Sequence, residues 1–212
     1  MRSTPTVISV AEHAGWANLV CVAVEGHVPT VVERRRAVTI GAGLPTMPYH
    51  HETLDMREDE ANALIARVRR SIARHTSRAL REVALELAGS RRVVALAIRE
   101  PPFAALPDTV DPVRRSYPLQ CAADGMMYQF AFCRAACHLG LDVHLCRRGQ
   151  EGSRAAARLK VPPREIEAFV NVAGRPLGPP WPQELRRAYA AGIAALAAHV
   201  PQLHLGTRKR NS

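Results

Sequence analysis

Lysine is almost missing from this chain. Lys160 and Lys209 are the only two among 212 residues, so the net charge of +10 rests on arginine. Arginine pairs with phosphate groups through two hydrogen bonds and stacks on bases, so this balance favours a polyanion partner such as nucleic acid, either DNA or RNA. The alternative is the coding bias of a GC-rich genome, which also favours Arg, Ala, Pro and Gly. Composition alone leaves both interpretations open.

Long apolar runs are missing as well. No stretch of about 18 or more uncharged apolar residues occurs, which argues against a membrane-spanning helix. The start, Met1-Arg2-Ser3-Thr4-Pro5, leads straight into a strand-like segment without the pattern of a signal peptide. We therefore expect a cytoplasmic protein that does not interact with membranes.

The chain has only five cysteines, an odd number, so a disulfide framework is not expected. The C-x-x-C spacing of common zinc modules is also missing. Cys133 and Cys137, one helical turn apart, could join His138, His144 and Cys146 in a zinc site. The favoured interpretation is structural: both cysteines should lie reduced in one buried stripe with Met126 and Phe130.

The remaining composition is that of a globular protein, with 47% hydrophobic residues. We predict one domain over residues 1–206, with insertions at about 41–56, 101–118 and 147–182 and a basic flexible tail over 207–212. Three strand-like runs open the chain, at 7–11, 16–24 and 28–40, and their short connections predict an antiparallel meander. Helices are expected over 57–88, 119–139, 161–170 and 183–199, with further strands over 93–98 and 141–146.

The strand at 93–98 is apolar throughout, which is typical of an inner parallel strand covered on both faces. Pro101 and Pro102 stop the sheet just beyond it, because proline offers no N–H donor. Glu100 is therefore predicted at the carboxyl end of this strand, where open α/β sheets place their ligands.

This order, βββαβαβα, resembles the ribonuclease H-like superfamily, and within it the Holliday-junction resolvase branch. Local patterns contribute to the resemblance: Gly15-Trp16-Ala17 opens the second strand, and the helix over 120–138 leads through Gly140-Leu141-Asp142-Val143 into the fifth. The resemblance covers roughly residues 7–199. It implies an α/β fold with a mixed five-stranded sheet and helices on both faces.

The resemblance also implies a site for divalent metal, Mg²⁺ or Mn²⁺, held by carboxylates of the first strand, the fourth strand and the last helix. Here Glu100 matches the fourth strand, Glu12 lies near the first-strand position and Glu184 is the acid of the last helix; Glu165 and Glu167 are substitutes. Two such ions can stabilise both the attacking and the leaving oxygen at a phosphodiester. The implied function is a nuclease with these three glutamates as catalytic metal ligands.

Two other functions stay open. The last helix lacks an Asp-x-x-Asp pair, which favours a non-catalytic module of the same fold that binds nucleic acid or protein. A small-molecule enzyme could instead use the loop His50-His51-Glu52 as a proton shuttle or metal ligand near Glu100.

A row of arginines recurs at three- and four-residue spacing on the side of the first helix away from its apolar stripe. It could follow a phosphate backbone, or it could be a solvated helix face. The row consists of Arg67, Arg70, Arg74, Arg78 and Arg81.

Overall fold

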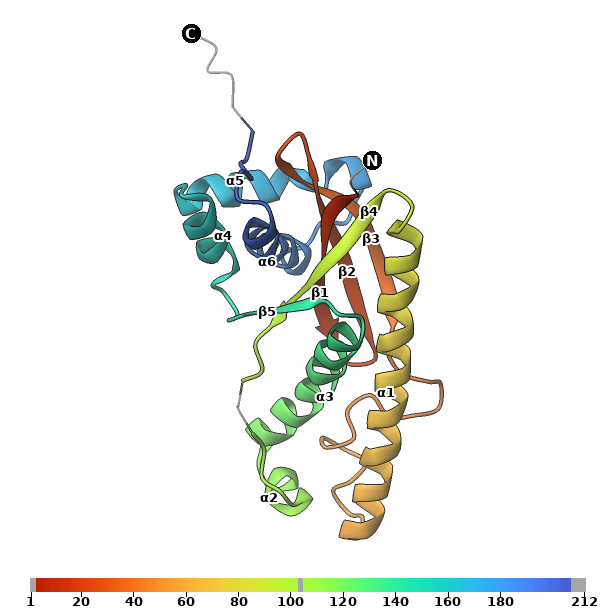
Figure 1. Ribbon diagram of the computed structural model, residues 1–212. Coiled ribbons are helices and arrows are strands. Elements are labelled where there is room, and N and C mark those ends of the chain that lie inside the picture. Colours follow the sequence, from red (N-terminus) through yellow and green to blue (C-terminus); the bar gives the residue numbers. More distant parts are fainter. Residues whose placement is uncertain (1–2, 103–104, 207–212) are drawn as a thin grey trace.

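The computed structural model describes residues 3–102 and 105–206, and its centre is one five-stranded sheet (Figure 1). The strands are β1 (Thr4–His13), β2 (Trp16–Glu25), β3 (Val28–Val38), β4 (Arg91–Arg99) and β5 (Asp142–Cys146), in the order β3-β2-β1-β4-β5. The first three pair antiparallel, and β4 runs parallel to both β1 and β5. The predicted meander and the inner parallel strand are thus confirmed, whereas the predicted tail over 207–212 lies outside the described residues.

Helices cover both faces of the sheet (Figure 1). The long helix α1 (Glu58–Leu87) and α3 (Tyr117–His138) lie on one face, and α6 (Gln183–His199) lies on the other with α4 (Glu151–Leu159) and α5 (Pro163–Ala173) beside it. The helices expected over 57–88, 119–139 and 183–199 are confirmed within about two residues. None of the described helices is both long and apolar enough to cross a membrane.

Two short helices were not predicted. The insertion at 101–118 contains α2 (Val110–Arg114), and the first part of the insertion at 147–182 contains α4. Helix α4 has an apolar face too small to recognise in the sequence, formed by Ala155 and Ala156, which pack in the same core cluster as α6. The expected order βββαβαβα is therefore extended by α2 and α4, whereas α5 is the helix expected over 161–170, found at Pro163–Ala173.

Side chains of β1 alternate between the two cores, as expected for a strand. Val7 packs in the core beneath α6, whereas Ile8 and Val10 pack in the core beneath α1 and α3. A third core lies beyond the sheet, where Tyr49 of the loop before α1 packs with Tyr128 of α3. The loop at 41–56 is therefore anchored between the two helices.

The prediction that Phe130 and Cys137 lie in a buried stripe of α3 is wrong. Met126 is buried as expected, but Phe130 is 44% exposed and Cys137 is also exposed. The sheet-facing stripe runs through Phe132, Ala135 and Ala136, so Phe130 and Cys137 lie on another side of the helix. Cys133 is half-buried, and burial raises the pKa of its thiol to about 11. The zinc group built on these cysteines does not form among the described residues.

Gly192 lets α6 approach the sheet closely. A Cβ at this position would lie 2.4 Å from Ser9 Oγ and 2.6 Å from Val22 Cγ2. Such contacts are far shorter than van der Waals distance, so only glycine fits here without displacement of the helix. The close approach fixes the depth of α6, and with it the position of Glu184 at its first turn.

Gly192→Ala should therefore lower stability by about 1–3 kcal/mol through overpacking, in spite of the better helix propensity of alanine. Gly125→Ala is the matched control, because a Cβ at Gly125 in α3 meets no atom within 4 Å. We expect this control to be neutral or to stabilise by about 0.5–1 kcal/mol. Urea unfolding of both variants measures the difference, and equal effects would contradict the close approach.

Candidate functional site

A groove crosses the carboxyl ends of β1, β4 and β5. It consists of two hollows, of about 480 and 610 Å³, whose linings share Arg99 and Arg148. The first lies between the ends of β1 and β4 and the start of α6; the second lies beside the start of α3. We call this the strand-end groove. Its place agrees with the rule that open α/β sheets bind ligands at the carboxyl ends of their strands.

Glu12 lies at the wall of the first hollow with its side chain only 6% exposed. Its Oε1 lies 2.7 Å from Arg99 Nη2 and accepts a hydrogen bond of 2.8 Å from Gln129 Nε2 of α3. Glu12 therefore leans towards α3. On the other face of β1, Ala11 and Ser9 lie on the α6 side, and Ser9 is a neutral residue buried against Gly192.

Glu184 begins α6 on the opposite wall of the first hollow. Its Oε1 accepts a hydrogen bond of 3.0 Å from Asn18 Nδ2, and its Oε2 lies 3.0 Å from His13 Nε2, at ion-pair distance but without hydrogen-bond alignment. The His13 ring is stacked on Trp16 with 3.9 Å between centroids. Residues of the β1–β2 hairpin thus occupy both carboxylate oxygens.

Glu100 follows β4 directly, as expected, because its N–H still donates to the carbonyl of Cys146 in β5. The side chain is 39% exposed and lines the second hollow, where its Oε2 accepts a hydrogen bond of 3.0 Å from Arg147 Nε. Glu12 and Glu184 share the first hollow, whereas Glu100 lies in the adjoining one.

Each of the three glutamates thus lies against a basic side chain: an arginine for Glu12 and for Glu100, and the His13 imidazole for Glu184. Within the described part of the chain, they form no cluster whose oxygens lie close enough to share one ion. The substitutes Glu165 and Glu167 are exposed on α5 and line neither hollow. The groove therefore presents arginines whose partners are carboxylates, a setting in which a phosphate could replace a carboxylate.

One set of residues over the described ranges does have metal-ligand geometry. One ligand atom each of Asp142, His144 and His199 lies within 4.8 Å of the others. These residues come from β5 and from the end of α6, whereas the strand-end groove lies at the start of α6. Sequence reasoning named His144 but grouped it with cysteines, because nothing local indicates that His199 meets β5.

The loop histidine His50 is buried rather than free, at 8% exposure. Its Nδ1 lies 2.9 Å from Asp124 Oδ2, and its Nε2 lies 3.3 Å from the sulfur of Cys121. Asp124 is 4% exposed, and burial raises the pKa of its carboxyl, against the lowering effect of the hydrogen bonds from His50 and from the Tyr49 N–H. Sequence reasoning missed this arrangement. The sequence feature that could have indicated it is Asp124, the one charged residue in the otherwise uncharged first half of α3.

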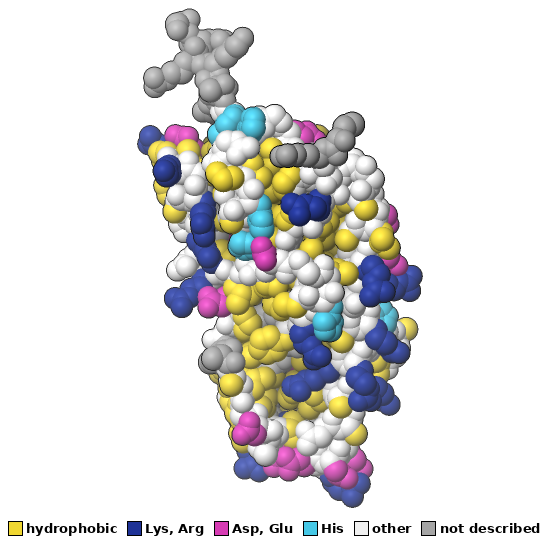
Figure 2. Space-filling view, in the orientation of Figure 1, with side chains coloured by type: hydrophobic (Ala, Val, Ile, Leu, Met, Phe, Trp, Pro, Cys, Tyr) yellow, Lys and Arg dark blue, Asp and Glu magenta, His cyan; other side chains and the backbone are white. Residues whose placement is uncertain are grey.

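The arginine row of α1 is exposed, and the side of the molecule formed by α1 carries a string of basic side chains (Figure 2). Of its five members, only Arg78 contacts a carboxylate within the described ranges, Glu82 at 2.7 Å. The other four guanidinium groups are available to solvent or to a polyanion.

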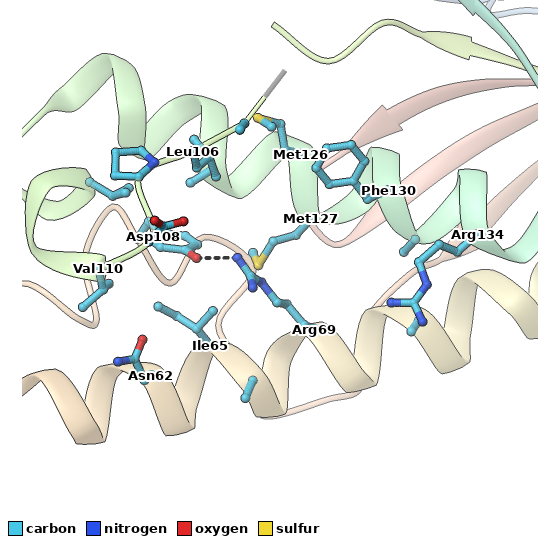
Figure 3. A pocket seen from close by; sticks show the side chains of 18 of the residues that line it. Asn62, Ile65, Arg69, Leu106, Asp108, Val110, Met126, Met127, Phe130 and Arg134 are labelled. Atoms are coloured by element: carbon cyan, nitrogen blue, oxygen red, sulfur yellow. Dashed lines mark hydrogen bonds between the residues drawn. The ribbon is translucent and has the colours of Figure 1, made fainter. Parts of the chain in front are cut away.

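A separate cavity of about 560 Å³ lies between α1 and α3 (Figure 3). Its lining is mostly apolar and includes Ile65, Met126 and the exposed Phe130, which explains why Phe130 is outside the core. Arg69 projects into it and donates a hydrogen bond of 2.7 Å to the Tyr49 hydroxyl. It shares no lining residue with the strand-end groove.

No protein-family model matches this chain, and no curated protein matches it. Solved structures do. The chain is similar to the Thermus thermophilus RuvC structure, with 15% identity, a TM-score of 0.53, and coverage of 93% of this chain and 97% of that one. It is likewise similar to T. thermophilus RuvC in complex with a Holliday junction substrate, with 16% identity, a TM-score of 0.52, and coverage of 92% and 94%. The fold is therefore ribonuclease H-like, as the resemblance implied.

Proposed function

We propose that this protein binds nucleic acid, with branched DNA as the first candidate, and that its strand-end groove holds phosphates without cleaving them. The observation that carries this proposal is that Glu12 and Glu100 are each paired with an arginine, while Asn18 and His13 lie against the two oxygens of Glu184. A metal ion at these oxygens would have to displace or accommodate those side chains. A phosphate, in contrast, can take the place of a carboxylate as the partner of an arginine.

The distribution of positive charge supports the same proposal. Arg99, Arg147 and Arg148 line the groove, and Arg187 of α6 lines its first hollow. The arginine row of α1 adds a second basic surface. A similar fold is described in complex with a Holliday junction, and its coverage of this chain is nearly complete. An extended branched ligand could contact more than one basic surface at once.

A second candidate is a Mg²⁺- or Mn²⁺-dependent nuclease with Glu12, Glu100 and Glu184 as metal ligands. One observation favours it: Glu12 and Glu184 line the same hollow at the strand ends. Hard divalent cations prefer such oxygen ligands. In this candidate Arg99 and His13 would turn away from the carboxylates when metal and substrate bind.

The salt dependence of binding tests the role of the α1 row. Arg67, Arg70 and Arg74 are exposed and not paired with carboxylates in the described structure, so replacing all three by Gln should remove about three phosphate contacts. The slope of log affinity against log salt should flatten by about 3 units, measured by fluorescence anisotropy with labelled junction and duplex DNA.

The control for this experiment replaces Arg92, Arg158 and Arg164, which are exposed on other elements, by Gln. It removes the same charge, so it separates local contacts from net charge. Equal slopes in the two triple variants would assign the α1 row to a solvated face.

A cleavage assay separates the two candidate functions. We expect no cleavage of junction, duplex or RNA–DNA hybrid in the presence of Mg²⁺ or Mn²⁺, while binding persists. If metal-dependent cleavage occurs, and Glu12→Gln and Glu184→Gln each abolish it without loss of binding, the nuclease candidate replaces the binding module. Thermal unfolding of each variant provides the control for folding.

A further inference from the structure

Cys121, His50 and Asp124 form a chain of contacts that the binding function does not use. The Asp124 carboxylate holds His50 Nδ1 at 2.9 Å through one oxygen, and its other oxygen accepts the Tyr49 backbone N–H at 3.1 Å. The aromatic ring of Tyr117 packs edge-on against His50, with 5.2 Å between centroids. The imidazole is thus fixed in orientation. Nε2 lies 3.3 Å from the Cys121 sulfur, and in the tautomer that carries its proton on Nδ1 the lone pair of Nε2 would face the thiol.

The three residues differ in solvent exposure, as nucleophilic catalysis by the thiol would require. Asp124 and His50 are buried, whereas Cys121 is exposed and lines the second hollow of the strand-end groove. A nucleophile beside a base that a third group orients is the general arrangement of nucleophilic catalysis. Loop anchoring alone would need the His50–Asp124 contact but no open thiol against Nε2.

We propose that Cys121 is a nucleophilic cysteine, activated by His50, that takes an acyl group from an ester or thioester bearing a negative charge. In this step Sγ attacks the carbonyl carbon and the thiol proton passes to His50 Nε2. The S–C bond forms, the bond to the leaving group breaks, and His50 returns the proton to the leaving oxygen or sulfur. Water then hydrolyses the acyl-Cys121, with His50 as its base.

The negative charge of the substrate follows from the walls of the hollow. Arg99, Arg147 and Arg148 line it, and Glu100 is the acid present in the same lining. Glu100 accepts a hydrogen bond from Arg147. The remaining positive charge favours an electrophile with a carboxylate or a phosphate group.

Alkylation by iodoacetamide tests the activation, because the thiolate displaces iodide in the same kind of attack. Peptide mass spectrometry of the native protein gives the rate at each cysteine. At pH 7 an ordinary thiol is only about 3% ionised, so we expect Cys121 to react about tenfold faster than Cys137. Cys137 is exposed on the same helix, and its sulfur has no histidine partner in the described structure.

Two variants distinguish activation from a structural role. His50→Gln and Asp124→Asn should bring the Cys121 rate to within about twofold of the Cys137 rate. The comparison of Cys121 with Cys137 in the unaltered protein needs no variant, so it decides the question even if His50→Gln fails to fold. Equal rates at the two cysteines of the unaltered protein would overturn the proposal.

The charge of the substrate has its own test. The ratio of the iodoacetate rate to the iodoacetamide rate at Cys121 should fall severalfold in Arg148→Gln, because Arg148 lines the hollow and attracts the anionic reagent. An unchanged ratio would remove the anionic substrate from the proposal.

A second inference rests on different residues. Buried Nε2 atoms of His144 and His199 have no hydrogen-bond partner in the described structure, although the rings pack edge-on with 5.7 Å between centroids. Oδ2 of Asp142 lies 3.6 Å from His199 Nε2, too far for a hydrogen bond. Two buried nitrogens without hydrogen-bond partners lie near one carboxylate. A bound ion would give all three groups a partner.

We infer that these residues bind Zn²⁺ or a similar transition metal, which would tie the start of β5 to the end of α6. Two imidazoles and one carboxylate suit zinc far better than magnesium. Arg154 and Arg158 of α4 act against the ion electrostatically.

Thermal unfolding with added Zn²⁺ tests this site. A saturating excess should raise Tm by about 5 °C or more, and Mg²⁺ should not. His144→Ala and His199→Ala should abolish the rise, whereas His51→Ala, an exposed loop histidine, should keep it. Loss of the rise in His51→Ala, or equal stabilisation of all variants, would overturn the site.

Discussion

The buried carboxylate of Glu12 requires a counter-charge, and the strand ends are arranged around the arginine that supplies it. Taking a carboxylate out of water costs several kcal/mol unless a cation and further donors compensate. Arg99 comes from the parallel neighbour β4, and Gln129 comes from α3. The carboxylate therefore joins two strands and a helix at one point. It also holds Arg99 where the two hollows of the groove meet.

This constraint bears on what we propose that the groove binds. Arg99 lies between the two hollows against Glu12, and Arg147 and His13 lie beside Glu100 and Glu184, so each carboxylate already has a side-chain partner. Divalent metals need free oxygen ligands that converge on one point, whereas phosphates need arginines whose present partners can be exchanged. The same fold can therefore serve nucleic-acid binding in either way, and the side chains at the strand ends decide between them.

Regular elements with strong local signals could be predicted from the sequence. The last helix is found at its predicted bounds, since Pro182 precedes it and its alanine-rich pattern is continuous. The meander and the strand before Glu100 followed in the same way from apolar runs and turns. Helix α4 was missed because its apolar face consists of two alanines that become buried only against the α6 side of the core.

The sites were harder to predict, because their residues are distant in sequence. Glu12, Glu100 and Glu184 were each predicted singly from the sequence, but their side-chain partners depend on how the strand ends and the start of α6 pack together. His50 meets Asp124 across 74 residues, and only the tertiary packing of the loop against α3 brings them together. Sequence spacing carries no information about such contacts.

The most direct test is a crystal structure of the protein soaked in Mn²⁺, with anomalous scattering used to locate the ions. Carboxylate oxygens bind such hard ions at roughly 2.1 Å, so a bound ion would be assigned to its ligands without ambiguity. Our account predicts no Mn²⁺ at Glu12, Glu100 or Glu184, and Arg99 still paired with Glu12. An ion held jointly by Glu12 and Glu184, with Arg99 turned away, would contradict it.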